Sequence, residues 1–180
     1  HHPTTLMQRT YGGQVLAQAL AAAYRTVPAD RVAHSLHAYF LRPGTVGSDI
    51  SYEVESARDG NTFSTRRVTA SQDKEIFSMS ASFHALEPGG LDHADPMPRE
   101  VPGPEDCPKL VEVMNARFGA RPFWREWDAL DIRFVGDSAP GGAISPGRHV
   151  ASMRVWVRTE GQLPDDLATH HAILAYLSDL

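Results

Sequence analysis

The hydrophobic and polar positions of the first 85 residues follow two different periods, which predict two kinds of element. Residues 11–24 read YGGQVLAQALAAAY, an alanine-rich segment opened by two glycines. Alanine has the highest helix propensity, and a helix that is apolar on nearly every side is usually buried. Because alanine side chains let other backbones come close, we expect a sheet to wrap around this helix.

From residue 32 onwards, apolar positions alternate with polar ones, as they do in half-buried strands. Strands are predicted over residues 32–41, 49–57, 63–71 and 77–85, joined by turns. In the last of them, Phe77, Met79, Ala81 and Phe83 share one face, while serines occupy the other. One helix followed by four such strands predicts an α+β fold with an antiparallel meander.

The middle of the chain carries a weaker pattern. Prolines and glycines are frequent between residues 87 and 108 and again between 136 and 147, which predicts irregular connections. Between them we expect a short helix at 110–118 and an extended stretch at 127–135. Residues 91–149 are therefore predicted to form a linker and irregular connection between two units.

Residues 150–180 resume a regular pattern and are assigned to the start of a second unit, after a first unit at residues 1–90. A strand is predicted at 150–159, where apolar and polar positions alternate. A second helix is expected to begin at Leu163–Asp166, where a proline and two acids suit a helix N-terminus, and to run uncapped to Leu180. This pattern predicts that the second unit is incomplete in this chain.

The composition limits the classes of function. The 180 residues carry a net charge of −5 and no basic stripe of the kind that nucleic-acid-binding proteins need, so no nucleic-acid partner is expected. No apolar run approaches the length of about 20 residues that a membrane span requires, so we expect no membrane insertion. Cys107 is the only cysteine, which excludes a disulfide framework and fits a reducing compartment such as the cytoplasm.

Two features could carry chemistry, and each has a structural alternative. Gly12 and Gly13 leave backbone N–H groups uncovered at a helix start, where the helix dipole favours negative charge. The same glycines could simply form a tight turn. Asp179 continues a ridge of alanines along the second helix. Burial there would make its carboxylate a general-base candidate, and the alternative is that it caps the helix or faces solvent.

Other residues are weaker candidates. His34 and His37 lie on a predicted strand and point to opposite faces, so they cannot hold one metal ion, and no metal site is expected. Arg66 and Arg67 also point to opposite faces. One could face a phosphate-bearing ligand and the other solvent, and the pattern does not choose between them. No nucleophile elbow, phosphate loop or dinucleotide fingerprint occurs.

Four blocks of the sequence resemble those of the type II acyl-CoA thioesterases. They are Tyr11–Gln14 with His34–Gly44, Arg58–Val68, Ala81–Phe83, and Leu163–Asp166 with Tyr176–Leu180. The blocks follow one another in order over residues 11–90 and 150–180. Matches in register are far more specific than any single block.

The resemblance implies a double hot-dog fold, in which two units share one chain and each consists of a long helix wrapped by an antiparallel sheet. It also implies hydrolysis of fatty acyl-CoA to free fatty acid and coenzyme A, a reaction of lipid metabolism. We expect no cofactor, and we expect a homo-oligomer in the cytoplasm. The family's catalytic aspartate matches Asp179, which would activate the attacking water. Its serine or threonine and its glutamine lie further downstream and have no counterpart in this sequence.

The resemblance also implies roles for residues near the first helix and the third strand. Gly13 and Gln14 would donate backbone N–H groups to the carbonyl oxygen as it gains charge. Gly12 lies directly behind them and is a substrate-binding candidate, as are Phe63 and Arg66. The acyl chain would lie in an apolar tunnel between helix and sheet.

Two alternative functions remain open. A non-catalytic acyl-CoA-binding module would explain why the downstream catalytic partners are absent. A hot-dog enoyl-CoA hydratase would need an acid and a histidine on the first helix or on the loop that leads into it, and the first helix has neither. Release of thiol from an acyl-CoA would distinguish a thioesterase from both.

Overall fold

A computed structural model describes residues 9–91, 93–98, 100–121, 127, 129–139, 141–142 and 151–180. The chain divides into two compact units. The first unit comprises residues 1–90 together with 163–180, and the second unit comprises residues 91–162. The segment after residue 163 therefore packs with the N-terminal part of the chain. The assignment of 1–90, 91–149 and 150–180 as first unit, linker and second hot-dog unit stays a prediction.

The alanine-rich segment forms helix α1 (Gly12–Tyr24), as predicted. Tyr11, just before the helix, has an extended backbone. At the other end, the Arg25 N–H bonds to the Ala22 carbonyl and the Thr26 N–H bonds to the Ala23 carbonyl. The helix buries six residues: Gly13, Val15, Leu16, Ala19, Leu20 and Ala23. Since four of these are glycine, alanine or valine, neighbouring backbones can lie close to the helix axis.

Four strands form one antiparallel sheet: β1 (Arg31–Phe40), β2 (Ser51–Asp59), β3 (Phe63–Ser71) and β4 (Glu75–Ala85). The strands themselves were predicted, but the simple meander was wrong, because the order is β1-β4-β3-β2. The connection between Phe40 and Ser51 is much longer than the two to five residues of a hairpin loop. It lets β1 pair with β4, where Phe40 lies opposite Phe77.

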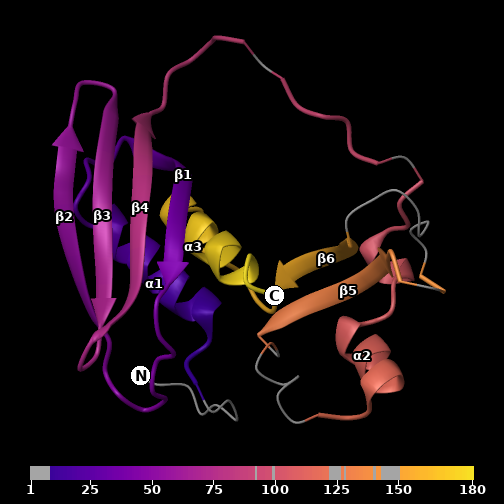
Figure 1. Ribbon diagram of the computed structural model, residues 1–180. Helices are drawn as coiled ribbons and strands as arrows, with labels where there is room; N and C mark the ends of the chain where they lie inside the picture. The colour runs from indigo at the N-terminus through magenta and orange to yellow at the C-terminus, as the bar shows by residue number, and fades with distance from the viewer. Residues whose placement is uncertain are drawn as a thin grey trace. The chain divides into compact units, whose positions relative to one another are not determined.

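Helix α1 lies along one face of this sheet and contacts all four strands (Figure 1). The sheet residues that form the core with it are Val68, Ala70, Ile76, Phe77, Met79, Ala81 and Phe83. The apolar face predicted for β4 is confirmed. Full burial of a large side chain such as Phe83 contributes about 1.5–3 kcal/mol, so the contact between helix and sheet stabilises the unit.

Helix α3 (Leu167–Leu177) packs beside α1 in the first unit (Figure 1). It begins later than predicted, because Asp166 is the N-cap and its Oδ2 accepts a hydrogen bond of 3.0 Å from the Thr169 N–H. The expectation of an uncapped helix running to Leu180 was also wrong. The helix ends at Leu177, where the Ser178 N–H bonds to the carbonyls of the preceding turn.

The far ends of α1 and α3 are joined through an aromatic side chain. The Tyr24 hydroxyl is hydrogen-bonded to His171 Nδ1 at 2.6 Å and accepts the Ala33 N–H at 2.8 Å. The ring of Tyr24 also meets Phe83 edge to face, with centroids 5.1 Å apart. One partly buried tyrosine thus links both helices to β1 and to the core of the sheet.

The second unit contains a short 3₁₀ turn, η1 (Pro104–Asp106), helix α2 (Leu110–Phe118) and an antiparallel pair, β5 (Leu130–Asp137) and β6 (Met153–Thr159). The predicted short helix is confirmed, whereas the extended stretch expected from residue 127 begins at Leu130. Leu110, Ile132 and Phe134 form a small core of their own. The loop expected at 136–147 lies partly outside the described residues.

The helices in the described part of the chain span 13, 9 and 11 residues. None of these described helices is long and apolar enough to cross a membrane.

Candidate active site

The N-terminus of α1 is capped by a residue from the far end of the chain. Tyr11, at the N-cap position, makes no side-chain cap hydrogen bond, and the first three helical N–H groups have no intrahelical partner. The Gly13 N–H donates to Oδ2 of Asp179 at 2.9 Å. A carboxylate is thereby held at the positive end of the helix dipole, where negative charge is favoured.

Asp179 lies two residues beyond the last residue of α3. The prediction that it continues a buried helical ridge was wrong in part, because the side chain is exposed and the helix ends at Leu177. Ser178 keeps nearly helical angles, with φ −68° and ψ −9°. The chain therefore continues in the helix direction for one more step and brings the Asp179 carboxylate to α1.

Two glycines make this close approach possible. A Cβ added at Gly12 would lie 2.6 Å from Oδ2 of Asp179 and 2.9 Å from the ring of Phe40. A Cβ added at Gly13 would overlap the carbonyl oxygen of Tyr176. The contact between the two helix ends therefore requires glycine at both positions. A tight turn alone would not explain this requirement.

Of the six site residues expected from the sequence, the structure brings together those at the two helix ends. Gly12, Gly13 and Asp179 are in contact, and Gln14 follows them as the third residue of α1. Among the described residues, neither Gly12 nor Gln14 has a hydrogen-bond partner for its backbone N–H. These N–H groups remain available at the helix start beside the carboxylate.

Phe63 is not part of this group. It lies at the start of β3 opposite His84 of β4, on the face of the sheet that does not carry the Phe77–Phe83 core. Its ring is 49% exposed and contacts the imidazoles of His34 and His84, at centroid distances of 5.8 and 4.6 Å. We therefore do not include Phe63 in the site at the helix ends.

Arg66 is held by the protein itself. Only 1% of its surface is exposed, and its guanidinium donates to Thr26 O and Asp59 Oδ1 at 2.8 and 2.7 Å, and also to the carbonyls of Arg58 and Thr65. The hydrogen bond from Arg66 lowers the pKa of the Asp59 carboxyl. Since these partners engage the guanidinium, we do not extend the proposed substrate site to Arg66.

Replacement of Arg66 by methionine is expected to lower the free energy of unfolding by about 1–3 kcal/mol, because buried carbonyls lose their donors. The neighbouring Arg67 provides a matched control. It is exposed and pairs with Glu55 at 3.4 Å, so Arg67→Met should change stability by no more than about 0.5 kcal/mol. Urea unfolding followed by circular dichroism measures both. Equal losses in the two variants would contradict the structural role of Arg66.

Sequence reasoning missed two aromatic residues at the site. The Tyr11 hydroxyl donates to the Tyr176 carbonyl at 3.0 Å, and the two rings meet edge to face with centroids 4.8 Å apart. Their positions in the sequence could have indicated them, because Tyr11 directly precedes the glycine pair and Tyr176 precedes Asp179 by three residues. Nothing in the local pattern indicated that these two segments meet.

An open polar cavity lies elsewhere in the first unit, between the 42–51 connection and the turn from β3 to β4. Its volume is about 710 Å³. The side chain of Gln72 holds the connection in place through hydrogen bonds with both backbone groups of Thr45. Two cations, Arg42 and Lys74, line this cavity.

The 42–51 connection is also bound to the segment before α1, because the Thr10 N–H donates to Gly44 O at 3.0 Å.

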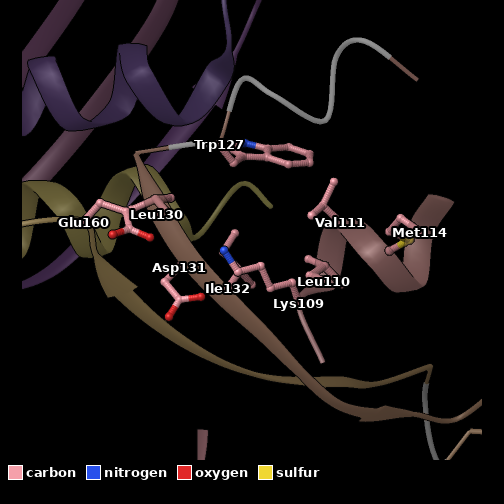
Figure 2. Close-up of a pocket in the computed structure, with 9 residues that line it drawn as sticks. All are labelled: Lys109, Leu110, Val111, Met114, Trp127, Leu130, Asp131, Ile132 and Glu160. Carbon is pink, nitrogen blue, oxygen red and sulfur yellow. The ribbon is translucent and has the colours of Figure 1, made fainter. Parts of the chain in front are cut away.

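The second unit has a small cavity of its own. It measures about 90 Å³ and is bordered by α2 on one side and β5 on the other, with Trp127 between them (Figure 2). Asp131 lines it but is bonded to Arg133 and Arg158 at 2.7 and 2.8 Å, and the hydrogen bond from Arg133 lowers its pKa. Sites for small organic ligands usually occupy about 300–1,000 Å³, so this space is too small for an acyl-CoA.

Within the described part of the chain, no group of three or more His, Cys, Asp or Glu residues is placed to hold a metal ion. His34 bonds instead to the Ser82 hydroxyl at 2.9 Å, and the ring of His37 packs against Tyr39.

A single helix contacted by every strand of an antiparallel sheet is the layering of hot-dog proteins. A conserved protein with a hot dog fold from Alicyclobacillus acidocaldarius matches 99% of this chain and 60% of its own, with a TM-score of 0.70 at 22% identity, a likeness that shows the fold alone. Residues 1–84 match the family model of the acyl-CoA thioesterase N-terminal domain, and residues 132–180 match the family model named acyl-CoA thioesterase. The chain belongs to the type II acyl-CoA thioesterase family.

Individual relatives agree with this assignment. Acyl-CoA thioesterase 2 of Haemophilus influenzae is 38% identical over 96% of this chain and 60% of its own length. The crystal structure of acyl-CoA thioesterase II TesB2 from Mycobacterium marinum matches 97% of this chain and 61% of its own, at 40% identity and a TM-score of 0.77. The chain thus spans about 60% of the length of these relatives. The hot-dog fold implied by the resemblance is confirmed.

Proposed function

We propose that the protein containing this chain hydrolyses fatty acyl-CoA to free fatty acid and coenzyme A. The observation that carries the proposal is the hydrogen bond from the Gly13 N–H to the Asp179 carboxylate. It brings a potential base next to uncovered N–H groups at a helix start. Thioester hydrolysis needs a proton acceptor for water and donors for the developing oxyanion, and membership of the thioesterase family supports the same reaction.

In the proposed mechanism, Asp179 accepts a proton from a water molecule as the water oxygen bonds to the thioester carbonyl carbon. The carbon–sulfur bond then breaks, coenzyme A leaves as a thiolate, and the proton passes from Asp179 to the sulfur. A thiolate leaves readily, so a strong general acid is not required. A positioned general base contributes about 10²–10⁴-fold to such a rate.

The donors divide into two roles. The Gly13 N–H holds Asp179, so Gly13 orients the base and could serve the oxyanion only by releasing it. We therefore assign the oxyanion to the Gln14 N–H, with the Gly12 N–H on the side where substrate approaches. One preorganised donor of this kind lowers the barrier by about 3–4 kcal/mol.

We place the acyl chain along the apolar side chains next to this helix start. Phe40 lies against Gly12 and is 52% exposed, and Leu36 lies on the same face of β1 and is 38% exposed. The phosphates of coenzyme A would meet exposed cations, for which Arg42 and Lys74 of the polar cavity are our candidates. If they do, the KM for an acyl-CoA should be lower than that for the matching acyl-pantetheine.

The test is an assay of the full protein on a series of acyl-CoA esters of increasing chain length, with thiol release followed by a colour reagent. We expect release well above the uncatalysed rate, with a preferred range of chain length. A protein that binds these esters but releases no thiol from any of them would overturn the proposal.

A binding measurement and an enoyl-CoA assay, run beside the thiol assay, separate the alternatives. An acyl-CoA-binding module would give saturable binding of palmitoyl-CoA without thiol. An enoyl-CoA hydratase would consume the enoyl double bond without thiol, and it is disfavoured because α1 carries neither acid nor histidine.

We further propose that the protein acts in the cytoplasm as a homo-oligomer. Its one cysteine suits a reducing compartment. Fractionation of cells and light scattering of the purified protein would test the two points separately, and a monomer by light scattering would contradict the second.

A further inference from the structure

The last carbonyls of α3 are all paired, and one of them is paired by a residue that is distant in the sequence. The Ser178 N–H bonds to the carbonyls of Leu174 and Ala175, and the Leu180 N–H bonds to that of Leu177. The remaining carbonyl, of Tyr176, accepts the Tyr11 hydroxyl at 3.0 Å. Helix ends leave such carbonyls unsatisfied unless another group supplies a donor.

The two helix ends therefore cap each other. Tyr11, just before α1, supplies the donor for the end of α3, and Asp179, just after α3, supplies the acceptor for the start of α1. We call Tyr11, Gly13, Tyr176 and Asp179 the helix-end clasp. Its two hydrogen bonds join residues that are 165 and 166 positions apart in the sequence.

We propose that Tyr11 is a positioning residue for Asp179, an inference that rests on the proposed function. Asp179 lies beyond the helix and is exposed, and among the described residues its carboxylate is held only by the Gly13 N–H. The Tyr11 hydroxyl fixes the backbone three residues earlier, at Tyr176. This hydrogen bond thereby limits the movement of residues 176–179 and keeps the Asp179 carboxylate within reach of the Gly13 N–H.

The effect of the Tyr11 hydroxyl can be measured separately from that of its ring. The edge-to-face contact between Tyr11 and Tyr176 involves the rings alone, with an interplanar angle of 65°. Phenylalanine at position 11 would keep this contact and remove the donor to the Tyr176 carbonyl. Tyr39→Phe is the matched control, because Tyr39 is 62% exposed on β1 and its described contact is with the ring of His37.

For Tyr11→Phe we expect kcat to fall about threefold to tenfold, the loss that corresponds to one ordinary hydrogen bond. KM should stay within about twofold, because the hydroxyl positions the base and does not hold substrate. Tyr39→Phe should leave both constants unchanged. A Tyr11→Phe enzyme with wild-type kcat would overturn the proposal, as would equal losses in the two variants.

Hydrogen exchange supplies a readout that does not depend on catalysis. The Gly13 amide should exchange about threefold to tenfold faster in Tyr11→Phe than in wild type, and at the wild-type rate in Tyr39→Phe. If wild type releases no thiol but shows this change, the clasp stands and the proposed function fails. If wild type is active and the Gly13 amide exchanges equally in both variants, the clasp fails and the proposed function stands.

Discussion

Replacement of Asp179 by asparagine should lower the rate of acyl-CoA hydrolysis by about 10²–10⁴-fold, the contribution of a positioned general base. The amide oxygen of asparagine can still accept the Gly13 N–H, so the contact that holds the two helix ends is kept. What is lost is the ability to take a proton from water. Steady-state kinetics of thiol release on one good substrate measures the change.

The chain offers a control carboxylate close to the same helix. Asp165 is exposed and lies just before the N-cap residue of α3, so Asp165→Asn removes a charge without touching the helix-end clasp. Its kcat should match wild type, and both variants should unfold at the wild-type urea concentration. If Asp179→Asn folds normally and hydrolyses substrate at nearly the wild-type rate, Asp179 is not the base.

The elements of the first unit could be predicted because their signals are local. The alanine-rich run specifies α1 and the alternation along 77–85 specifies the buried face of β4, since each depends only on the period of neighbouring residues. The position of β1 could not be obtained in this way. Strand order depends on which edge a strand reaches after a long connection, and the pairing of Phe40 with Phe77 is made across the sheet.

Arg66 shows where a local signal existed and was not used. It shares its side of β3 with Val68 and Ala70, both of which are buried. The alternation therefore already placed Arg66, and not Arg67, on the core side. The pattern could not predict the hydrogen-bond acceptors that a buried guanidinium needs, because Thr26 and Asp59 lie outside β3.

The candidate site was predicted in its parts but not as an arrangement. Asp179 and the glycine pair were identified as candidates from the helix pattern and given roles by the family resemblance, whereas Tyr11 was not identified, because its partner lies 165 residues away. The exposed position of Asp179 also differs from the expected burial. A helical ridge predicts burial only while the helix continues, and α3 ends two residues earlier.

Replacement of Gly13 by alanine should cost both stability and activity. Alanine favours a helix over glycine by about 1 kcal/mol, but the added Cβ would overlap the Tyr176 carbonyl oxygen, a backbone atom that cannot rotate away. Overpacking of this kind costs about 1–3 kcal/mol. The end of α3 must move, so Asp179 leaves the Gly13 N–H, and a misplacement of about 1 Å can reduce a rate about 10²-fold.

Comparison with Gly12→Ala separates the loss of activity from the loss of stability. The new Cβ would meet the Asp179 carboxylate and the Phe40 ring, which are ends of side chains that can rotate. We therefore expect a similar loss of activity with little change in the urea midpoint, whereas Gly13→Ala should lower both. Gly103→Ala, whose Cβ would meet only Asp106 Oδ2 at an ordinary 3.5 Å, should change neither. Full activity in Gly13→Ala would mean that the two helix ends do not stay in contact during turnover, and the assignment of Asp179 to this site would then fail with it.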